Sequence, residues 1–175
     1  SLRRIDWLID ALLKISKIDA GTVEFRSERV SVAELIRRAA APLMIPMELR
    51  GQELGIHADS EEYTGDMQWS VEAIGNILKN CVEHTPEGGS IEISAAENAL
   101  FTEIVISDSG AGFEPGDIPH LFERFYRGKN ADAASVGIGL ALARTVIAAQ
   151  NGTVAASNGK NGGAQFTVRF YKNIV

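Results

Sequence analysis

The chain has 175 residues, 45% hydrophobic and 23% charged, which is typical of a folded globular protein about one domain in size. Its single cysteine, Cys81, excludes an internal disulfide and a cysteine-based metal cluster, and the net charge of −6 argues against nonspecific nucleic-acid binding. No apolar stretch is long enough to span a bilayer, and Asp6 and Asp10 interrupt any signal peptide. Because the chain begins with Ser1, we expect a fragment of a longer protein.

The first predicted element is an amphipathic helix. Apolar residues recur at three- and four-residue spacings over residues 2–18, and the segment 19–21 (Asp-Ala-Gly) ends the pattern. The apolar stripe is unusually complete for a chain terminus, where fraying is common. We therefore expect this helix to pack on a partner helix outside this sequence, while packing on its own domain remains the alternative.

A strand and a second helix follow. Alternating residues over 22–26 predict a short strand. Ser31 and Glu34 form a capping-box pattern that opens a helix. Pro42 and Pro46 are expected to end or kink that helix.

The middle of the chain predicts a helix and a hairpin. Residues 51–65 show no clear period apart from a strand near His57, and residues 67–84 again have helical spacing. After a turn at 86–89, two alternating runs on either side of Asn98 predict a hairpin of half-buried strands.

The C-terminal third predicts a helix over 136–149 and a strand pair at 153–157 and 165–170. Hairpin strands with helices grouped between them favour an α+β fold, in which helices cover one face of an antiparallel or mixed sheet.

A glycine-rich segment connects the hairpin to this last helix. Six of the thirty residues from Gly110 to Gly139 are glycine, and such a long connection is usually a functional cover. Gly137 and Gly139 directly precede the helix, where backbone N–H groups can hold a phosphate. Turn geometry alone is the alternative, because the segment lacks the lysine of a P-loop and the third glycine of a dinucleotide fingerprint.

Three polar residues are candidate ligand contacts. Asn76 and Asn80 lie on one face of the predicted helix, and an asparagine oxygen suits a magnesium ion that also carries phosphate oxygens. Asp108 follows a strand and can accept a hydrogen bond from an exocyclic amine such as that of adenine. A buried asparagine network and a simple turn aspartate are the respective alternatives.

Five motifs occur in a fixed order between residues 66 and 170. They are NILKN at 76–80, DSGAGF at 108–113, FERFYR at 122–127, GIGLAL at 137–142 and GGAQF at 162–166. In order and spacing they resemble the N, G1, F, G2 and terminal glycine motifs of the catalytic ATP-binding domain of bacterial sensor histidine kinases, in the GHKL superfamily. The resemblance implies the two-layer α/β sandwich of the GHKL (Bergerat) fold, preceded by an N-terminal helix.

The resemblance also implies roles on the adenine and metal side of the site. Asn80 would ligate the Mg²⁺ that bridges the ATP phosphates, with Asn76 on the same face. Asp108 would bind the adenine amino group, while Gly110 and Gly112 would shape its pocket.

On the phosphate side, Gly137, Gly139 and Leu140 would open the helix beneath a lid. Cations of the lid would meet the γ-phosphate as it leaves, because phosphoryl transfer depends on positioning and cationic stabilisation. The lid cations that the resemblance implies are Arg124, Arg127 and Lys129, and the anchoring aromatic residues of the lid are Phe122 and Phe125.

The resemblance implies a protein-histidine kinase of a two-component system. It would transfer the ATP γ-phosphoryl group to a histidine on a separate helical hairpin, for relay to a response regulator. Residues 1–20 would be the end of the second hairpin helix and residues 21–175 the catalytic domain. The acceptor histidine lies on the first hairpin helix in the family and is expected outside this chain. The full-length protein would be a homodimeric, membrane-anchored sensor with this domain in the cytoplasm.

Two residues depart from the common pattern, and two other functions compete. Where many members have Lys-Tyr, this chain has Glu83 and His84, so we expect weakened nucleotide affinity, with His84 stacking less area on adenine than tyrosine would. A GHKL ATPase of the DNA-gyrase type would need a carboxylate at Asn76 to activate water. A non-catalytic nucleotide-sensing module is the second alternative, because Glu83 removes a cation.

Overall fold

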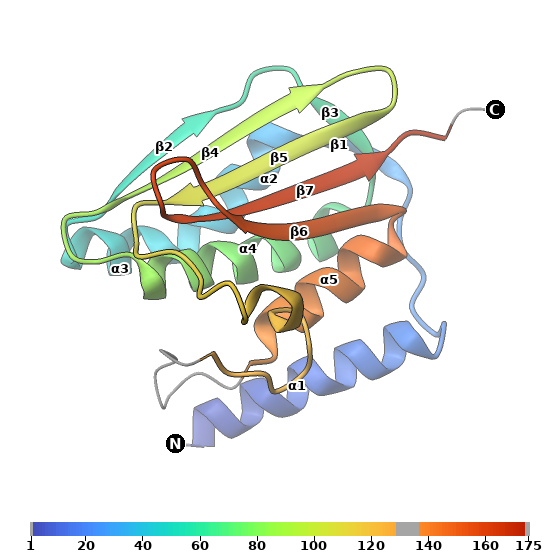
Figure 1. Cartoon of the computed structure of the whole chain (residues 1–175). Coiled ribbons are helices and arrows are strands. Elements are labelled where there is room, and N and C mark those ends of the chain that lie inside the picture. The colour runs from blue at the N-terminus through green and yellow to red at the C-terminus, as the bar shows by residue number, and fades with distance from the viewer. Residues whose placement is uncertain (1, 129–136, 174–175) are drawn as a thin grey trace.

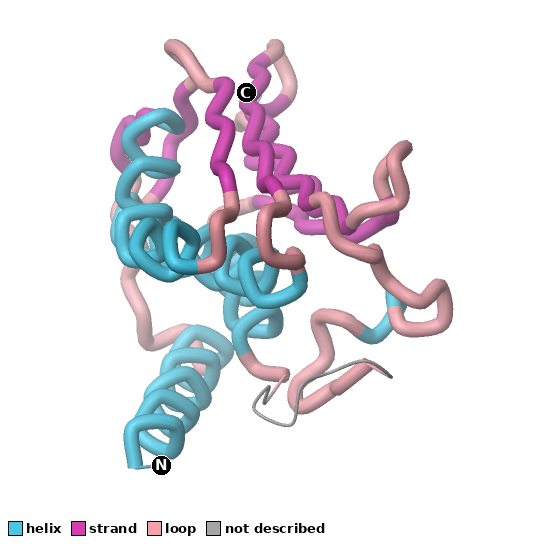
Figure 2. Tube along the Cα trace, turned by 90° about the vertical axis from the view of Figure 1, so that its left-hand side faces the viewer, coloured by secondary structure: helices cyan, strands magenta, loops and turns pink. Residues whose placement is uncertain are grey.

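A five-stranded sheet and a layer of helices form the body of the protein (Figure 1). The computed structural model describes residues 2–128 and 137–173. Figure 2 shows the strands on one side and the helices on the other, with the N-terminal helix at the outer side of the helical layer. Within the described ranges, no helix is both long and apolar enough to cross a membrane.

The elements are defined by the following bounds. The helices are α1 (Leu2–Asp19), α2 (Val32–Ala40), η1 (Ala41–Leu43), α3 (Met44–Leu49), α4 (Met67–His84), η2 (Ile118–His120) and α5 (Gly139–Ala149). The strands are β1 (Glu28–Ser31), β2 (Glu53–His57), β3 (Glu62–Gly65), β4 (Ser90–Glu97), β5 (Phe101–Asp108), β6 (Gly152–Asn158) and β7 (Ala164–Tyr171).

The main sheet has the order β2-β4-β5-β7-β6 and is mixed. β2 and β4 are parallel, whereas the other neighbours are antiparallel, with Ile104 of β5 opposite Val168 of β7. β1 and β3 form a separate antiparallel pair. The expected α+β class, with helices on one face of a mixed sheet, is confirmed.

The core lies between the sheet and α2, α4 and α5. Ile104, Ile106 and Phe166 point inward from the central strands, and Ile77 and Ile147 meet them from α4 and α5, all fully buried. Burial of each such side chain stabilises the fold by about 1.5–3 kcal/mol. This packing fixes α4 and α5 relative to the end of β5.

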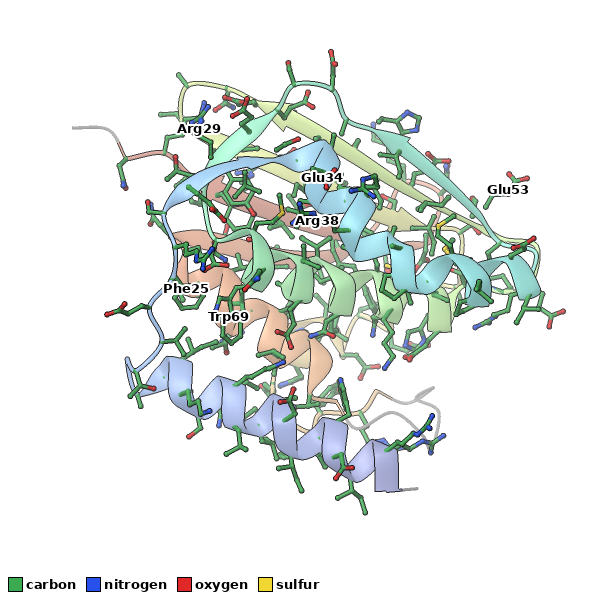
Figure 3. All side chains as sticks on the ribbon, turned by 180° about the vertical axis from the view of Figure 1, so that it is seen from behind. Phe25, Arg29, Glu34, Arg38, Glu53 and Trp69 are labelled. Carbon is green, nitrogen blue, oxygen red and sulfur yellow. The ribbon has the colours of Figure 1, made fainter. Side chains whose placement is uncertain are left out.

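The predicted cap of α2 is present. The Ser31 hydroxyl accepts a hydrogen bond from the backbone N–H of Glu34 at 3.3 Å, so the helix begins at Val32. The Glu34 side chain does not complete the box, because it binds Arg37 and Arg38 (Figure 3). These two guanidinium groups lower the pKa of Glu34 to about 2. As expected from Pro42, α2 ends at Ala40.

The strand predicted at residues 22–26 is wrong. Its backbone is irregular because its N–H groups have other partners: that of Thr22 binds the carbonyl of Lys17, and that of Arg26 binds the carboxylate of Asp66. Phe25 packs on Trp69 of α4 with ring centroids 5.6 Å apart (Figure 3). Strand pairing begins only at Glu28.

The N-terminal helix α1 packs on its own domain through one face. Ala11 and Ile15 are buried against the body, where α1 lies beside α5 (Figure 1). Ile5, Ile9 and Leu13 form a second apolar face that is about half exposed. The inner face of α1 therefore packs on its own domain, which was the alternative. Packing of the outer face on a partner helix stays a prediction.

Two other boundaries differ from the expectation. The last helix begins at Gly139 rather than at Val136, which lies outside the described residues. Residues 51–65 contain two strands, β2 and β3. β2 contains the strand expected near His57, whereas β3 was not predicted. β2 gives only a weak periodic signal because it is an edge strand in which Ile56 remains 45% exposed.

A buried carboxylate at the start of α4 yields a stability prediction. Asp66 caps α4 by accepting from the Trp69 N–H at 3.0 Å, and it also accepts from the Arg26 N–H at 2.8 Å. We expect Asp66→Ala to lower the free energy of unfolding by about 1–3 kcal/mol, because both N–H groups lose their acceptor. Asp66→Asn keeps one acceptor oxygen and should lose less. Urea titrations measure both.

The control is Ser31→Ala, which removes an exposed cap and should cost about 0.5–1 kcal/mol. An Asp66→Ala protein as stable as the Ser31→Ala protein would contradict this role of the buried carboxylate.

Candidate functional site

A cleft of about 530 Å³ opens where the C-terminal half of α4, the end of β5 and the start of α5 converge. This volume lies in the range of small-molecule sites, roughly 300–1,000 Å³. The segment after β5 forms its other wall through residues 111–128.

The α4 wall carries the two predicted asparagines. Asn76 and Asn80 are one turn apart and both line the cleft. The Asn76 Nδ2 group is buried and has no hydrogen-bond partner among the described residues. Gly139 lies against Asn76, since a Cβ on this glycine would be 3.9 Å from the Asn76 Cβ. An unpaired buried donor costs about 1–3 kcal/mol, so Asn76 is poised for an acceptor that a ligand brings.

Two side chains hold the C-terminal end of α4 in place. Gln52 donates from Nε2 to the carbonyls of Val82 and Thr85, at 3.1 and 2.8 Å. Arg50 donates to the same two carbonyls. These bonds satisfy carbonyls that a helix end leaves without partners, and so fix the turn that carries Asn80.

Asp108 lines the cleft, and the two oxygens of its carboxylate have different surroundings. Its Oδ1 accepts from the backbone N–H groups of Gly110 and Ala164, at 2.9 and 3.1 Å. Its Oδ2 is buried and has no partner among the described residues. Burial raises the pKa of the neighbouring Cys81 thiol well above its usual value, and the charge of Asp108 adds to the rise. Asp108 thus offers one unused acceptor to the cleft.

Two glycines allow close backbone approach at this end of the cleft, Gly163 against Asp108 and Gly112 against Gly162. A Cβ on Gly163 would lie 1.9 Å from the Asp108 carbonyl oxygen. Any side chain at position 163 would therefore push the start of β7 away from Asp108. Gly112 has φ of +80°, and its Cβ would meet the Gly162 carbonyl at 2.2 Å. Both positions require glycine for close backbone approach.

The start of α5 presents N–H groups to the cleft that have no hydrogen-bond partner within residues 2–128 and 137–173. The helix begins at Gly139 without a side-chain cap, and Gly137, Gly139 and Leu140 all line the cleft. The first N–H groups of a helix lack partners, and the helix dipole favours an anion there. This end of α5 is therefore a fitting phosphate site.

A backbone hydrogen bond joins the segment after β5 to the residues just before α5. The Phe125 N–H donates to the Gly137 carbonyl at 2.9 Å. Tyr126 donates its hydroxyl to Asp117, which raises the pKa of the tyrosine, and both residues line the cleft. Phe122 packs on the core as expected, whereas Phe125 is 53% exposed, so its expected role as a core anchor is wrong.

The described residues form no conventional metal cluster at the cleft. Over the described residues, no group of three His, Cys, Asp or Glu side chains could hold a metal ion. The donor set of the cleft fits a cation held by one amide oxygen together with oxygens of a bound phosphate ligand.

The structure brings most of the predicted residues together. Nine of them line the cleft: Asn76, Asn80, His84, Asp108, Gly112, Arg127, Gly137, Gly139 and Leu140.

Three predicted residues stand apart. Gly110 does not line the cleft, and its N–H donates to the Asp108 carboxylate. Arg124 does not line the cleft, because its guanidinium pairs with Asp19 at the end of α1, at 2.5 Å. Lys129 lies outside the described residues.

Trp7 and Lys79 also line the cleft, although neither was predicted to do so. Lys79 precedes Asn80 and faces the cleft from α4, so the helical periodicity alone could have found it. Trp7 comes from α1, and no local pattern links residues so far apart in the sequence.

Solved structures share this fold. The chain aligns with the Acinetobacter baumannii histidine kinase AdeS at a TM-score of 0.84, with 17% identity, over 99% of this chain and 81% of that one. For the mycobacterial sensor histidine kinase MprB the TM-score is 0.76 and the identity 23%, over 85% of this chain and 100% of that one. Full-length ShkA in complex with AMPPNP aligns at 0.80, with 21% identity, over 96% of this chain and 36% of that one.

Curated relatives point the same way. The chain is 30% identical over 165 residues to the signal transduction histidine-protein kinase BaeS of Escherichia coli K12, covering 92% of this chain and 35% of BaeS. It is 28% identical over 167 residues to the heme sensor protein HssS of Staphylococcus saprophyticus, covering 94% of this chain and 36% of HssS. The chain thus spans little more than a third of these relatives. Residues 65–174 match the family model, and the chain belongs to the histidine kinase-, DNA gyrase B- and HSP90-like ATPase family.

Proposed function

We propose that this chain is the ATP-binding catalytic part of a two-component sensor histidine kinase. It binds ATP with Mg²⁺ and transfers the γ-phosphoryl group to a histidine on a helical hairpin, from which a response regulator receives it. Its relatives BaeS and HssS are named as a histidine-protein kinase and a sensor protein, which supports this assignment.

The observation that carries the proposal is the unused acceptor of Asp108. A buried carboxylate oxygen without a donor is costly, and an adenine amino group would supply the missing hydrogen bond. The carboxylate cannot rotate to find Oδ2 a donor, because its Oδ1 accepts hydrogen bonds from the N–H groups of Gly110 and Ala164. Gly112 and His84 line the same cleft, and His84 offers the purine ring a stacking surface.

The phosphates would lie between α4 and the start of α5. Asn76 Nδ2 and the N–H groups after Gly137 are donors without partners within the described residues, and they would bind phosphate oxygens. Asn80 would hold Mg²⁺ through its amide oxygen. When bound, the ion would neutralise charge on the phosphates and align the terminal group.

The chemistry favours transfer over hydrolysis. In transfer, a histidine nitrogen forms the new bond to the γ-phosphorus while the bond to the bridging oxygen breaks, and ADP leaves with that electron pair. The cleft would orient the phosphate chain, and Arg127 would stabilise charge on the leaving groups. Activating water instead needs a base, and an amide such as Asn76 cannot accept a proton.

The predicted lid cations differ in whether they can reach a phosphate in the cleft. Arg127 lines the cleft, whereas Arg124 would have to leave Asp19 before it could reach a phosphate. Lys129, outside the described residues, stays a predicted cation of the lid.

We also propose that residues 1–20 are the end of the second hairpin helix and residues 21–175 the catalytic domain. The outer face of α1, formed by Ile5, Ile9 and Leu13, is suited to pairing with the rest of the hairpin and its dimer partner. In the whole protein this domain would lie on the cytoplasmic side of a membrane-anchored sensor.

Phosphotransfer to the hairpin tests the function. Mixing the chain with the phosphoacceptor hairpin of its own sensor and γ-labelled ATP should give an acid-labile, base-stable phosphohistidine on the hairpin. A hairpin whose acceptor histidine is replaced by alanine is the control. Sustained phosphate release that ignores the hairpin would instead indicate an ATPase, and binding without either product would indicate a nucleotide-sensing module.

The adenine contact yields a second prediction. Asp108→Asn keeps the oxygen that accepts from Gly110 and Ala164 but places an NH₂ group opposite the adenine amine. ATP affinity should fall about 10- to 100-fold in calorimetric titrations, since a hydrogen bond to a charged group is lost. Inosine triphosphate, which presents a carbonyl at the same ring position, should not lose affinity. An equal loss for both nucleotides would contradict this contact.

The metal contact yields a third prediction. Removing Mg²⁺ with a chelator should lower the ATP affinity of the unmodified protein, whereas Asn80→Ala should bind weakly in both conditions, because its metal ligand is gone. Calorimetry with and without Mg²⁺ measures this dependence. If Asn80→Ala still gains affinity from Mg²⁺ as the unmodified protein does, Asn80 is not the ligand.

A further inference from the structure

The charges around the cleft do not favour a triphosphate without help. Among its described lining residues the cations are Lys79 and Arg127, while Glu83, Asp108, Glu114 and Asp117 are carboxylates. Glu83 occupies the place where many family members carry lysine. A cation close to Asn80 would offset this negative charge where the phosphates are expected.

Lys79 is in the right place to be that cation. It lies one turn before Glu83 on α4, next to Asn80 in sequence, and its side chain faces the same cleft. None of the ion pairs within the described residues includes Lys79, so its ammonium is not neutralised by a carboxylate there.

An aromatic ring holds this ammonium. The Lys79 Nζ lies 4.8 Å from the centroid of the Trp7 ring, within the distance for a cation–π interaction. Trp7 is partly buried and itself lines the cleft. One face of the ammonium meets the ring, which leaves N–H donors for a phosphate. The ring also limits the freedom of a flexible side chain, which lowers the entropy that phosphate binding would cost.

α1 delivers Trp7 to this point by antiparallel packing across the helical layer. Two contacts show the register: Trp7 lies at Lys79, and seven residues later Lys14 pairs with Glu72, seven residues earlier in α4, at 2.7 Å. The buried Ala11 and Ile15 lie between or just beyond these contacts and hold α1 on the body.

We propose that Lys79 is a triphosphate-binding cation of this cleft, replacing the lysine that the family places one turn later, and that Trp7 of α1 is its positioning residue. The inference rests on the proposed function, since it assumes that ATP occupies the cleft. It assigns a nucleotide-binding role to a residue from the helix that precedes the catalytic domain.

Affinities for ATP and AMP in calorimetric titrations test the cation. Lys79→Met should weaken ATP binding about 10- to 100-fold and AMP binding less than about twofold, because the ammonium meets the outer phosphates. The matched control is Lys14→Met, which removes a lysine from the same helix interface but does not line the cleft. It should leave both affinities within about twofold.

A double-mutant cycle tests the positioning role. Trp7→Ala should weaken ATP binding about two- to fivefold and spare AMP, and Trp7→Phe should recover part of the loss, since phenylalanine retains a ring face. In the Lys79→Met background, Trp7→Ala should have no further effect on ATP. A merely structural tryptophan would lower ATP and AMP affinities alike and would act independently of Lys79.

The outcomes separate this inference from the proposed function. If the unmodified protein binds ATP with Mg²⁺ but Lys79→Met binds it equally well, or loses ATP and AMP affinity to the same degree, the inference is wrong and the function stands. If the unmodified protein does not bind ATP, both are overturned. Urea titrations of each variant verify that the fold is intact.

Discussion

The site depends on the different roles of the two Asp108 carboxylate oxygens. Oδ1 joins the end of β5 to Gly110 in the following segment and to Ala164 at the start of β7, whereas Oδ2 is buried and meets no partner in the part of the chain that the structure describes. The first oxygen is structural, and it holds the second in a fixed position. The fold thus carries an unsatisfied acceptor in its core, and a bound amine would recover the lost hydrogen-bond energy.

The surrounding elements serve to keep that geometry. Gly163 lets β7 begin against the Asp108 backbone, and Gln52 and Arg50 fix the end of α4 across the cleft. The apolar layer between sheet and helices sets the position of α4 relative to α5, and with it the distance between the asparagines and the uncapped helix start. Stability and site geometry therefore have a common origin, as expected where a rigid scaffold positions ligand-binding groups.

The sequence patterns correctly predicted elements that depend on residues close together in the chain. The helical spacing of residues 67–84 gave α4 with its bounds unchanged, and Ser31 with Glu34 marked the start of α2, because both depend on neighbours within one or two turns. The motif spacing also anticipated that Asn76, Asp108 and Gly139 share a cleft. The strand predicted at 22–26 failed because a distant carboxylate, that of Asp66, takes the N–H of Arg26. Strand β3 was not predicted, because it is short and its partner, β1, lies more than thirty residues away.

What the sequence could not provide is the position of α1. Periodicity predicted the helix and its apolar stripe, but the stripe divides into an inner face at Ala11 and Ile15 and an outer face at Ile5, Ile9 and Leu13. The inner face sets how α1 lies across the body, and that arrangement places Trp7 at Lys79 and Asp19 at Arg124. Both contacts join α1 to segments that border the cleft, one through a lysine beside Asn80 and one through the segment that carries Arg127. A helix that is also suited to pairing with a hairpin through its outer face would thus touch the cleft through its inner one, so any force that lifts α1 must break contacts at the nucleotide site.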